Sequence, residues 1–192
     1  MHETLISDSH YPELHVDIAL NDRVVDLVEE GFDLAIRIGP RLDPGLVARK
    51  IASMRIVLCA SPAYLKKYGT PTDPEQLASH NCMTYAYSSQ ENNWPFTRKT
   101  AERTVSVSGN LRVNNGNVLV SAAIEGLGII RQPAFLVADA LRKKTLIRVL
   151  PDWDAGEHSV PAVYPNRQFL PPKVRTFIDF LAERFGRESD WM

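Results

Sequence analysis

The sequence has few cysteines, no long hydrophobic run and almost no net charge. Cys59 and Cys82 are its two cysteines, both in short apolar segments, where we expect small buried side chains and no disulfide framework. No apolar run approaches the ~20 residues that a membrane-spanning helix needs, and the first residues lack the basic and apolar regions of a signal peptide. We therefore expect a cytoplasmic protein with no membrane partner.

Positive charge is sparse for a nucleic-acid-binding protein. The chain carries 22 Lys and Arg against 23 Asp and Glu, a formal net charge of −1. Binding to DNA depends largely on a dense basic face that neutralises phosphates, whereas the basic residues here are scattered. The densest run, Arg142-Lys143-Lys144, is typical of a solvated helix end. We expect this chain by itself to make no contact with DNA.

The motifs of common catalytic and cofactor sites are missing as well. The five histidines form neither an HExxH pattern nor a cysteine–histidine pattern, and the sequence has no Gly-x-Ser-x-Gly motif and no glycine-rich phosphate loop. Gly126-Leu127-Gly128 ends a predicted helix, whereas a dinucleotide-binding fingerprint begins one, so we interpret it as a helix stop with a tight turn. We expect no cofactor, no metal ion and no catalytic residue.

The sequence does contain a regular alternation of short apolar runs and helical patterns. Hydrophobic residues make up 44 % of the chain, which is ordinary for a globular protein. The alternation favours an α/β fold with mainly parallel strands. Strands are predicted over residues 14–20, 32–38, 46–51, 56–60, 104–107, 111–113, 129–130, 146–150 and 160–164.

Several helix boundaries carry specific signals. Ser61-Pro62 and Asp73-Pro74 each combine a capping side chain with a proline at the first helical position, which predicts two helix starts. Residues 24–28 have helical spacing and are followed by a stop at Gly31. Residues 91–97 are predicted to form a loop. Further helices are predicted to begin at Asn114–Asn117, Pro133 and Pro171-Pro172, the last with an apolar stripe of Val174, Phe177, Ile178, Leu181 and Phe185.

Three segments place polar groups where a ligand could bind. Asn114-Asn115-Gly116 follows a strand and begins a helix, where free N–H groups and the helix dipole suit an anion, although plain capping by an asparagine side chain is favoured. Arg37-Ile38-Gly39-Pro40 ends a strand, and Arg37 either binds a ligand carboxylate or, as the sequence favours, pairs with an acid such as Asp33. Arg131-Gln132-Pro133 has the same strand-to-helix geometry, again with capping and a solvated charge as the favoured interpretation.

The segment Asp26–Gly39 (DLVEEGFDLAIRIG) resembles the effector-binding domain of LysR-type transcriptional regulators. Four more segments support this resemblance because they occur in the family's order and spacing. Together the five segments identify residues from about 11 to 186 with the family. The four are Leu46–Lys50, Leu58–Leu65, Gly126–Ile130 and Pro171–Leu181.

The resemblance implies a fold like that of type 2 periplasmic binding proteins, with two Rossmann-like α/β lobes joined by two crossover strands. Residues 1–58 and 163–192 would form lobe I and residues 59–162 lobe II, with crossovers near Cys59-Ala60 and Pro161–Val163. By the same comparison, the first strand of lobe I and the N-terminal winged helix-turn-helix domain of a complete regulator are absent from this chain.

The resemblance also implies that a small-molecule effector, such as an organic acid or an aromatic metabolite, binds in the cleft between the lobes. It implies a homodimer that becomes a tetramer in the full-length form and contacts DNA only through the N-terminal domain. Mapped onto this sequence, the effector-binding residues would be Leu20, Asn21, Arg37, Ile38, Gly39, Pro40, Asn114, Asn115, Gly116, Arg131, Pro133 and Val163.

The hypothesis that follows is a ligand-sensing regulatory domain that performs no chemistry. One alternative is an extracytoplasmic solute-binding receptor of the same fold, which would need a signal peptide or a lipid anchor. Another alternative is a small enzyme on this fold, which would need a paired acid and base in the cleft. The sequence contains no such pair that we can identify.

Overall fold

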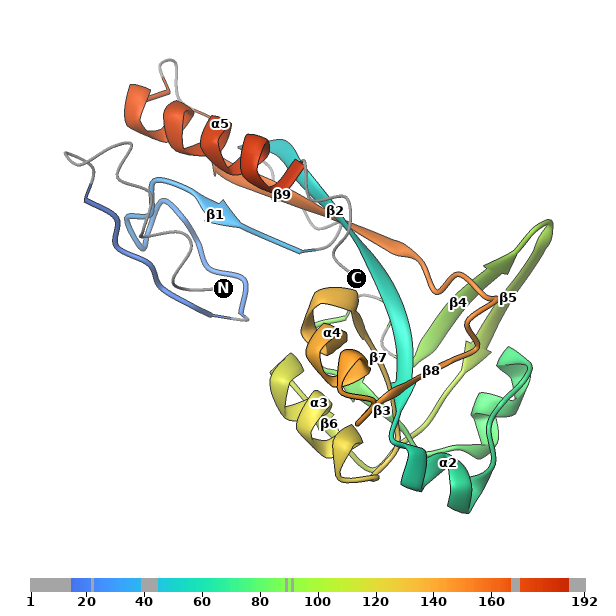
Figure 1. The fold of residues 1–192 in the computed structure, drawn as a ribbon. Coiled ribbons are helices and arrows are strands. Elements are labelled where there is room, and N and C mark those ends of the chain that lie inside the picture. The colour runs from blue at the N-terminus through green and yellow to red at the C-terminus, as the bar shows by residue number, and fades with distance from the viewer. Residues whose placement is uncertain are drawn as a thin grey trace.

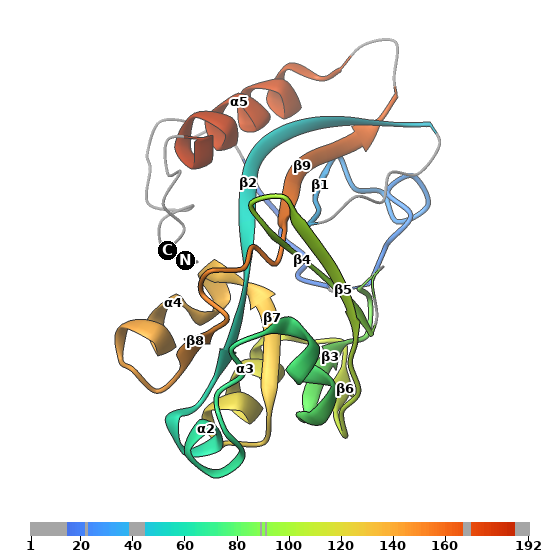
Figure 2. The same cartoon turned by 90° about the vertical axis from the view of Figure 1, so that its right-hand side faces the viewer.

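The computed structural model describes residues 15–21, 23–38, 45–88, 90, 92–166 and 170–186. Two long strands, β2 (Leu46–Ala60) and β9 (Glu157–Pro165), run between two groups of elements (Figure 1). One group contains β1 (Ala35–Ile36) and α5 (Pro172–Gly186), and we call it lobe I. The other group, lobe II, contains the elements between β2 and β9 (Figure 2). The two-lobed α/β architecture is therefore as predicted, whereas the exact boundaries of the lobes remain a prediction.

The strand β2 is a single strand of 15 residues, and the prediction of two strands over 46–51 and 56–60 is wrong. Polar and small side chains between those segments interrupt the hydrophobic pattern, but their backbone continues to pair with β9, so the strand continues. β2 pairs antiparallel with β9 as far as Arg55 and with β7 (Ile129–Pro133) from Ile56 onward. The change of partner between these two residues is the point where the chain crosses from lobe I to lobe II.

Lobe II is built on both edges and both faces of the second half of β2. Because β7 and β8 both pair with Leu58 and Cys59, they lie on opposite edges of β2. The helices α3 and α4 pack on one face, and the β4–β5 hairpin with Trp153 packs on the other. The elements of this lobe besides β7 are α2 (Pro62–Tyr68), the 3₁₀ helix η1 (Pro74–Ser79), β3 (Cys82–Tyr85), β4 (Asn93–Arg98), β5 (Ala101–Ser106), β6 (Arg112–Val113), α3 (Gly116–Ile124), α4 (Ala134–Arg142) and β8 (Ile147–Val149).

The expectation of mainly parallel strands is wrong for the pairs that the structure describes. Strand β3 pairs parallel with both β6 and β7. The pairs of β2 with β7, β8 and β9 are antiparallel, as are β1 with β9 and β4 with β5. For β2 and β9 the physical reason is the crossover itself, because a strand that returns from lobe II to lobe I beside β2 must run in the opposite direction.

The predicted capping signals are confirmed. The hydroxyl of Ser61 accepts a hydrogen bond from the N–H of Tyr64 at 3.2 Å and caps α2. Asp73 caps η1 together with Gln76 in a reciprocal capping box. Helix α3 ends before Gly126, whose φ of +80° is the left-handed conformation expected of a helix stop.

Predictions for the first forty residues are less accurate. Residues 15–20 form no strand, and all of them are exposed; Leu14 lies outside the described residues. A strand forms only where a neighbour supplies backbone partners, and no described residue does so here. Of the segment 24–28, only residues 27 and 28 belong to a turn, which ends at Gly31 with a φ of +75°. Of the strand predicted over 32–38, only β1 is present.

The predicted loop over 91–97 is also wrong, because β4 occupies most of it. Trp94 is only 3 % exposed and packs in the core of lobe II, and β4 pairs with β5 along its whole length. Polar and proline residues in β4 concealed the strand from the sequence pattern. In lobe I, the predicted apolar stripe of α5 is confirmed, since Val174, Ile178 and Leu181 are buried against β2 and β9. No helix within the described ranges is both long and apolar enough to cross a membrane.

Candidate functional site

Strand register brings one edge of lobe II to the crossover. Pro133, the last residue of β7, lies opposite Ile56, where β2 changes partner. Because β6 and β7 are both parallel to β3, the carboxyl ends of all three strands lie at this same edge. The predicted site segments at Asn114–Gly116 and Arg131–Pro133 are therefore neighbours at the crossover. Ligands of open α/β sheets bind at such carboxyl ends.

The start of α3 is capped by Asn115. Its side-chain oxygen accepts hydrogen bonds from the N–H groups of Asn117 at 3.0 Å and Val118 at 3.3 Å. This is the capping interpretation that the sequence favours. Both Asn114 and Asn115 are exposed, so their contact with a ligand remains a prediction that this capping does not exclude.

Gly116 has a packing role that the sequence alone does not reveal. A Cβ atom at this position would lie 2.7 Å from Cδ1 of Leu136 and 3.1 Å from Oε1 of Gln132. Gln132 is buried, at 3 % exposure. The glycine thus lets the start of α3 approach the end of β7 and the start of α4, which holds the two predicted segments of lobe II together.

Two tyrosines at the same edge were missed by the sequence analysis. Tyr85 ends β3, and its ring meets that of Tyr87 edge to face with a centroid distance of 6.0 Å. The side-chain nitrogen of Asn114 lies 3.5 Å from the hydroxyl of Tyr87, which is 51 % exposed. The sequence signal that could have identified these two tyrosines is their position at and just after the end of an apolar strand. They add aromatic surface beside the start of α3.

Arg131 is held by a single hydrogen bond at the crossover. Its Nη2 donates to the carbonyl of Ala155 at 2.6 Å, and burial lowers the pKa of its guanidinium to about 10. Its Nε is shielded from solvent and has no hydrogen-bond partner among the described residues. The side chain is therefore half-buried, and its Nε–H group lacks a hydrogen-bond acceptor among the described residues. The sequence favoured a solvated charge at this position.

In lobe I, Arg37 lies just beyond the end of β1. Its N–H donates to the carbonyl of Pro161 at 3.1 Å, and its Nη2 donates to the carbonyl of Val25 at 2.9 Å. Asp33, given above as an example of an acidic partner for Arg37, forms an ion pair with Lys173 at 2.7 Å. A contact between Arg37 and a ligand remains a prediction. β1 runs antiparallel to β9, so its carboxyl end faces the crossover.

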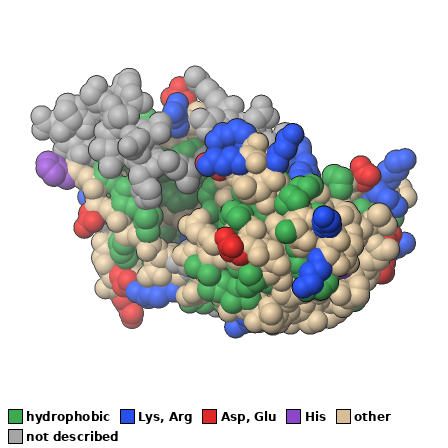
Figure 3. All heavy atoms as spheres, turned by 60° about the horizontal axis from the view of Figure 1, so that its bottom comes forward, with side chains coloured by type: hydrophobic (Ala, Val, Ile, Leu, Met, Phe, Trp, Pro, Cys, Tyr) green, Lys and Arg blue, Asp and Glu red, His purple; other side chains and the backbone are tan. Residues whose placement is uncertain are grey.

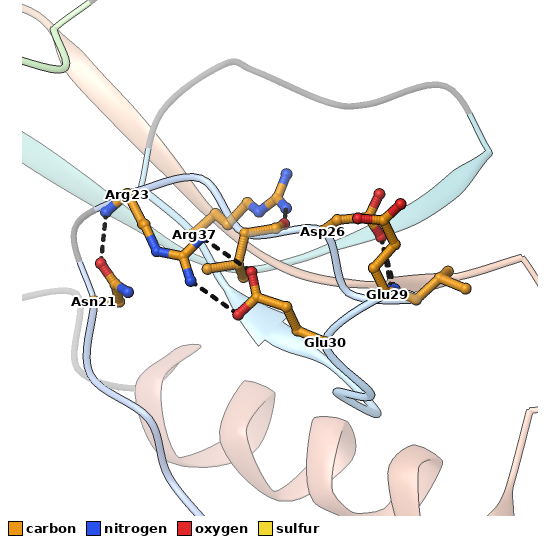
Figure 4. A network of polar contacts seen from close by, with 8 residues as sticks. Asn21, Arg23, Asp26, Glu29, Glu30 and Arg37 are labelled. Atoms are coloured by element: carbon orange, nitrogen blue, oxygen red, sulfur yellow. Dashed lines mark hydrogen bonds and ion pairs between the residues drawn. The ribbon is translucent and has the colours of Figure 1, made fainter.

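Of the other residues predicted in lobe I, one forms a hydrogen bond within the lobe, and two are exposed apolar side chains. Asn21 accepts a hydrogen bond from the N–H of Arg23 at 3.0 Å, and Arg23 forms two hydrogen bonds to Glu30, at 2.9 and 3.0 Å (Figure 4). Leu20 is 74 % exposed and Ile38 49 %. Gly39 and Pro40 lie outside the described residues.

Val163 differs from the other predicted residues because it is buried inside lobe I. It is fully buried and lies in β9 between Ala35 of β1 and Ala48 of β2. Its side chain has no exposed surface through which a ligand could contact it. Val163 is therefore not among the contacts of the proposed site.

The described residues contain no metal-binding cluster and, on the one face drawn in Figure 3, no continuous basic surface. No group of three or more His, Cys, Asp or Glu side chains within the described ranges is arranged to hold a metal. On the face shown in Figure 3, basic side chains are interspersed with acidic and hydrophobic ones. The described surface thus shows no continuous basic face on that side.

Comparison with known proteins identifies the family. Residues 8–186 match the family described as the LysR substrate binding domain. The chain belongs to the LysR substrate-binding domain family. An uncharacterized HTH-type transcriptional regulator of Haemophilus influenzae is 37 % identical over 85 % of this chain and 57 % of its own length. The regulator PtxR of Pseudomonas aeruginosa is 34 % identical over 93 % of this chain and 57 % of its own length.

Solved structures of LysR-type regulators share the fold. The full-length virulence activator AphB of Vibrio cholerae superposes with a TM-score of 0.76 and 31 % identity, covering 91 % of this chain and 59 % of AphB. The regulatory domain of CrgA from Neisseria meningitidis gives a TM-score of 0.72 and 32 % identity, covering 83 % of this chain and 78 % of that domain. The chain spans a little under three fifths of the length of the first two curated relatives named above, and those relatives are regulators of transcription.

Proposed function

We propose that this LysR substrate-binding domain senses a small-molecule effector between its lobes and passes the signal to DNA-binding domains of a bacterial transcriptional regulator. The observation that carries the proposal is the convergence of strand ends. The carboxyl ends of β1 in lobe I and of β6 and β7 in lobe II all face the crossover of β2. An effector held there would touch both lobes.

The lobes are connected in a way that suits a change of their relative angle. Around Arg55 and Ile56 the sheet is narrow, because β2 there leaves β9 and has just begun to pair with β7. A ligand shifts such an equilibrium only by the difference in its affinity for the two arrangements. Residues that contact the ligand from both lobes supply this difference, since opening the lobes separates them.

The chemistry of the site favours an organic acid, or an aromatic metabolite that carries one. The start of α3 and the guanidinium groups of Arg37 and Arg131 are positive, and each suits a carboxylate. Tyr85 and Tyr87 offer ring surface next to the start of α3. The proposed contacts are Leu20, Asn21, Arg37 to Pro40, Asn114 to Gly116, Arg131 and Pro133.

The remaining partners are proposed by analogy with the family. The domain would form a homodimer in the cytoplasm, and tetramers in the full-length regulator. DNA would be bound by helix-turn-helix domains such as those that the names of the relatives state. The domain would act as a sensor and leave its ligand chemically unchanged.

A thermal-shift screen of organic acids and aromatic metabolites tests the proposal. A ligand at 100 times its Kd stabilises the folded state by about 2.7 kcal/mol, which raises the Tm of a domain this size by roughly 5–10 °C. We expect an effector found in this way to bind at least about tenfold more weakly to Asn115→Ala. Asn93→Ala, at an exposed position of β4 away from the crossover, is the matched control.

Two outcomes would contradict the proposal. An effector whose affinity is the same for Asn115→Ala and the wild type would place its binding site elsewhere. Chemical conversion of the bound ligand, followed by mass spectrometry, would show an enzyme in place of a sensor.

A further inference from the structure

The guanidinium of Arg131 lacks an acceptor at the place where the lobes join. Nη2 donates to Ala155, while Nε is shielded and has no partner. Across the residues that the structure describes, no carboxylate forms an ion pair with Arg131. Folded proteins rarely leave a buried donor of a charged group without an acceptor. A carboxylate oxygen is a suitable acceptor for this N–H group.

The side chain of Arg131 crosses over β2 to reach the second crossover strand. Arg131 belongs to β7, on one edge of β2. Gly156 lies on the other edge, because its carbonyl accepts a hydrogen bond from the N–H of Ile56 at 2.9 Å. The hydrogen bond to Ala155 therefore spans the strand. The guanidinium thus lies over the residue at which β2 changes partner.

Gly156 lies beside the guanidinium of Arg131. Its φ is +102°, a conformation that other residues adopt only with strain. A Cβ on Gly156 would lie 3.5 Å from Nη2 of Arg131. The guanidinium therefore sits directly against the backbone where the chain enters β9.

His158 lies two residues further along, on the same face of the sheet. It is opposite Met54 in β2, just as Arg131 is opposite Leu58, and both of these β2 residues point to the same side because side chains alternate along a strand. His158 is half-buried; burial and the charge of Arg131 lower its pKa, while a hydrogen bond with the backbone of Glu157 acts in the opposite direction. The imidazole of His158 is therefore near the guanidinium of Arg131.

The other charged groups around His158 do not neutralise this pair. Glu157 and Arg55 lie opposite each other and, by the same alternation, point to the other face of the sheet. The Asp154 carboxylate accepts the N–H of Gly156 at 2.9 Å. Helix α5 covers Met54 with apolar residues, and its exposed Asp179 pairs with Arg49.

We propose that Arg131 and His158 form an anion site at the hinge, in which a small carboxylate supplies the acceptor that Nε of Arg131 lacks. This deepens the proposed function, on which it rests, by naming where the charge of the effector binds. Both side chains donate N–H groups, and a carboxylate has acceptor oxygens for each. Because the site joins β7 of lobe II to the start of β9, an anion there links ligand binding to the position of the lobes.

The site has a consequence for pH dependence. An anion next to His158 favours its protonated form, so the pKa of His158 is higher in the complex than in the free protein. Binding then takes up a proton at any pH between these two pKa values. We therefore expect affinity for a carboxylate to rise as the pH falls through this range.

An NMR titration of the His158 ring in the full chain tests the proposal, with His158→Gln used to assign the signal. The probes are sodium acetate and sodium benzoate at about 0.1 M, which fills even a millimolar site. Acetamide and benzamide are the uncharged controls, at the same ionic strength. We expect the carboxylates to raise the pKa of His158 by about one unit, equivalent to tenfold tighter binding to the protonated form, and the amides to leave it unchanged.

Variants separate an anion site from a purely structural role. Arg131→Gln should abolish the carboxylate-induced shift, and Arg131→Lys, which keeps the charge, should retain part of it. If Arg131→Gln does not fold, calorimetry on His158→Gln takes its place, and benzoate affinity should then lose its increase between pH 7.5 and 5.5, roughly the range in which an unperturbed histidine titrates. Equal pKa values with and without carboxylate, or equal shifts in Arg131→Gln and wild type, would overturn the proposal.

The result also separates this proposal from the proposed function. A carboxylate-induced shift of His158 that persists in Asn115→Ala supports the hinge site whether or not an effector moves the lobes. An effector that moves the lobes without shifting the pKa of His158 would support the sensor and overturn the hinge site.

Discussion

Asn115 combines a structural role with a proposed role in binding. Its side chain caps α3 through two hydrogen bonds to backbone N–H groups. Loss of such a cap costs about 1 kcal/mol, so we expect Asn115→Ala to lower the Tm of the free domain by roughly 2–4 °C. Asn115→Asp, which can also cap, should stay close to the wild type. Thermal denaturation measures both, and an Asp variant as unstable as the Ala variant would contradict the assigned cap.

The two cysteines are predicted to be unreactive in the folded protein. Cys59 and Cys82 are fully buried, and burial raises the pKa of each thiol to about 12. The thiolate is the reactive form, so almost none is present at pH 8. We expect a thiol reagent such as dithionitrobenzoate to label neither cysteine until urea unfolds the chain. Rapid labelling of the native protein at pH 8 would contradict this burial.

At the scale of helices and strands, local capping chemistry was predictable and pairing was not. Ser61, Asp73 and Asn115 were identified from the sequence because a cap depends on residues within one helical turn. β2 was divided in two because its continuity depends on β9, a hundred residues later in the chain. The strand β4 was missed for a similar reason, since its pairing with β5 outweighs its polar composition.

The parts of the candidate site that depend on local sequence were predictable, and the contacts between distant strands were not. The strand-to-helix junctions at Asn115 and Pro133 follow from local pattern, and strand register then brings them to one edge. His158 was not found, because its nearness to Arg131 arises only when two distant strands flank β2. The close packing of Gly116 against Leu136 was not predicted from the sequence, and its contact with a ligand remains a prediction.

We predict that the packing of helix α5 stabilises lobe I. Ile178 is 1 % exposed and packs against β2 and β9, whereas Arg175 on the same helix is exposed. Truncation of a buried isoleucine to alanine removes about 2–5 kcal/mol, so Ile178→Ala should shift the urea midpoint strongly. Arg175→Ala should change the free energy of unfolding by less than about 0.5 kcal/mol. Equal effects of the two substitutions would show that α5 does not hold lobe I together.

At the scale of the whole molecule, each lobe has its own core, and Phe135 of α4 in lobe II also packs against the core of lobe I. The core of lobe I lies between α5 and the first half of β2, and lobe II has one core on each face of the second half. β2 and β9 connect these cores through Arg55, Ile56 and Gly156. Apart from the contact of Phe135, each lobe can therefore keep its own packing while the angle between them changes, which is the mechanical requirement of the proposed sensor.

The most direct test of the account is the distance between the lobes with and without effector. Spin labels at Lys66→Cys in α2 and Arg175→Cys in α5 report this distance by pulsed electron paramagnetic resonance, since both positions are exposed and the native thiols are buried. We predict that a bound effector changes the distance distribution, and that Asn115→Ala needs at least about tenfold more effector for the same change, about 1.4 kcal/mol in binding free energy. A saturating effector that leaves the distribution unchanged would contradict the account.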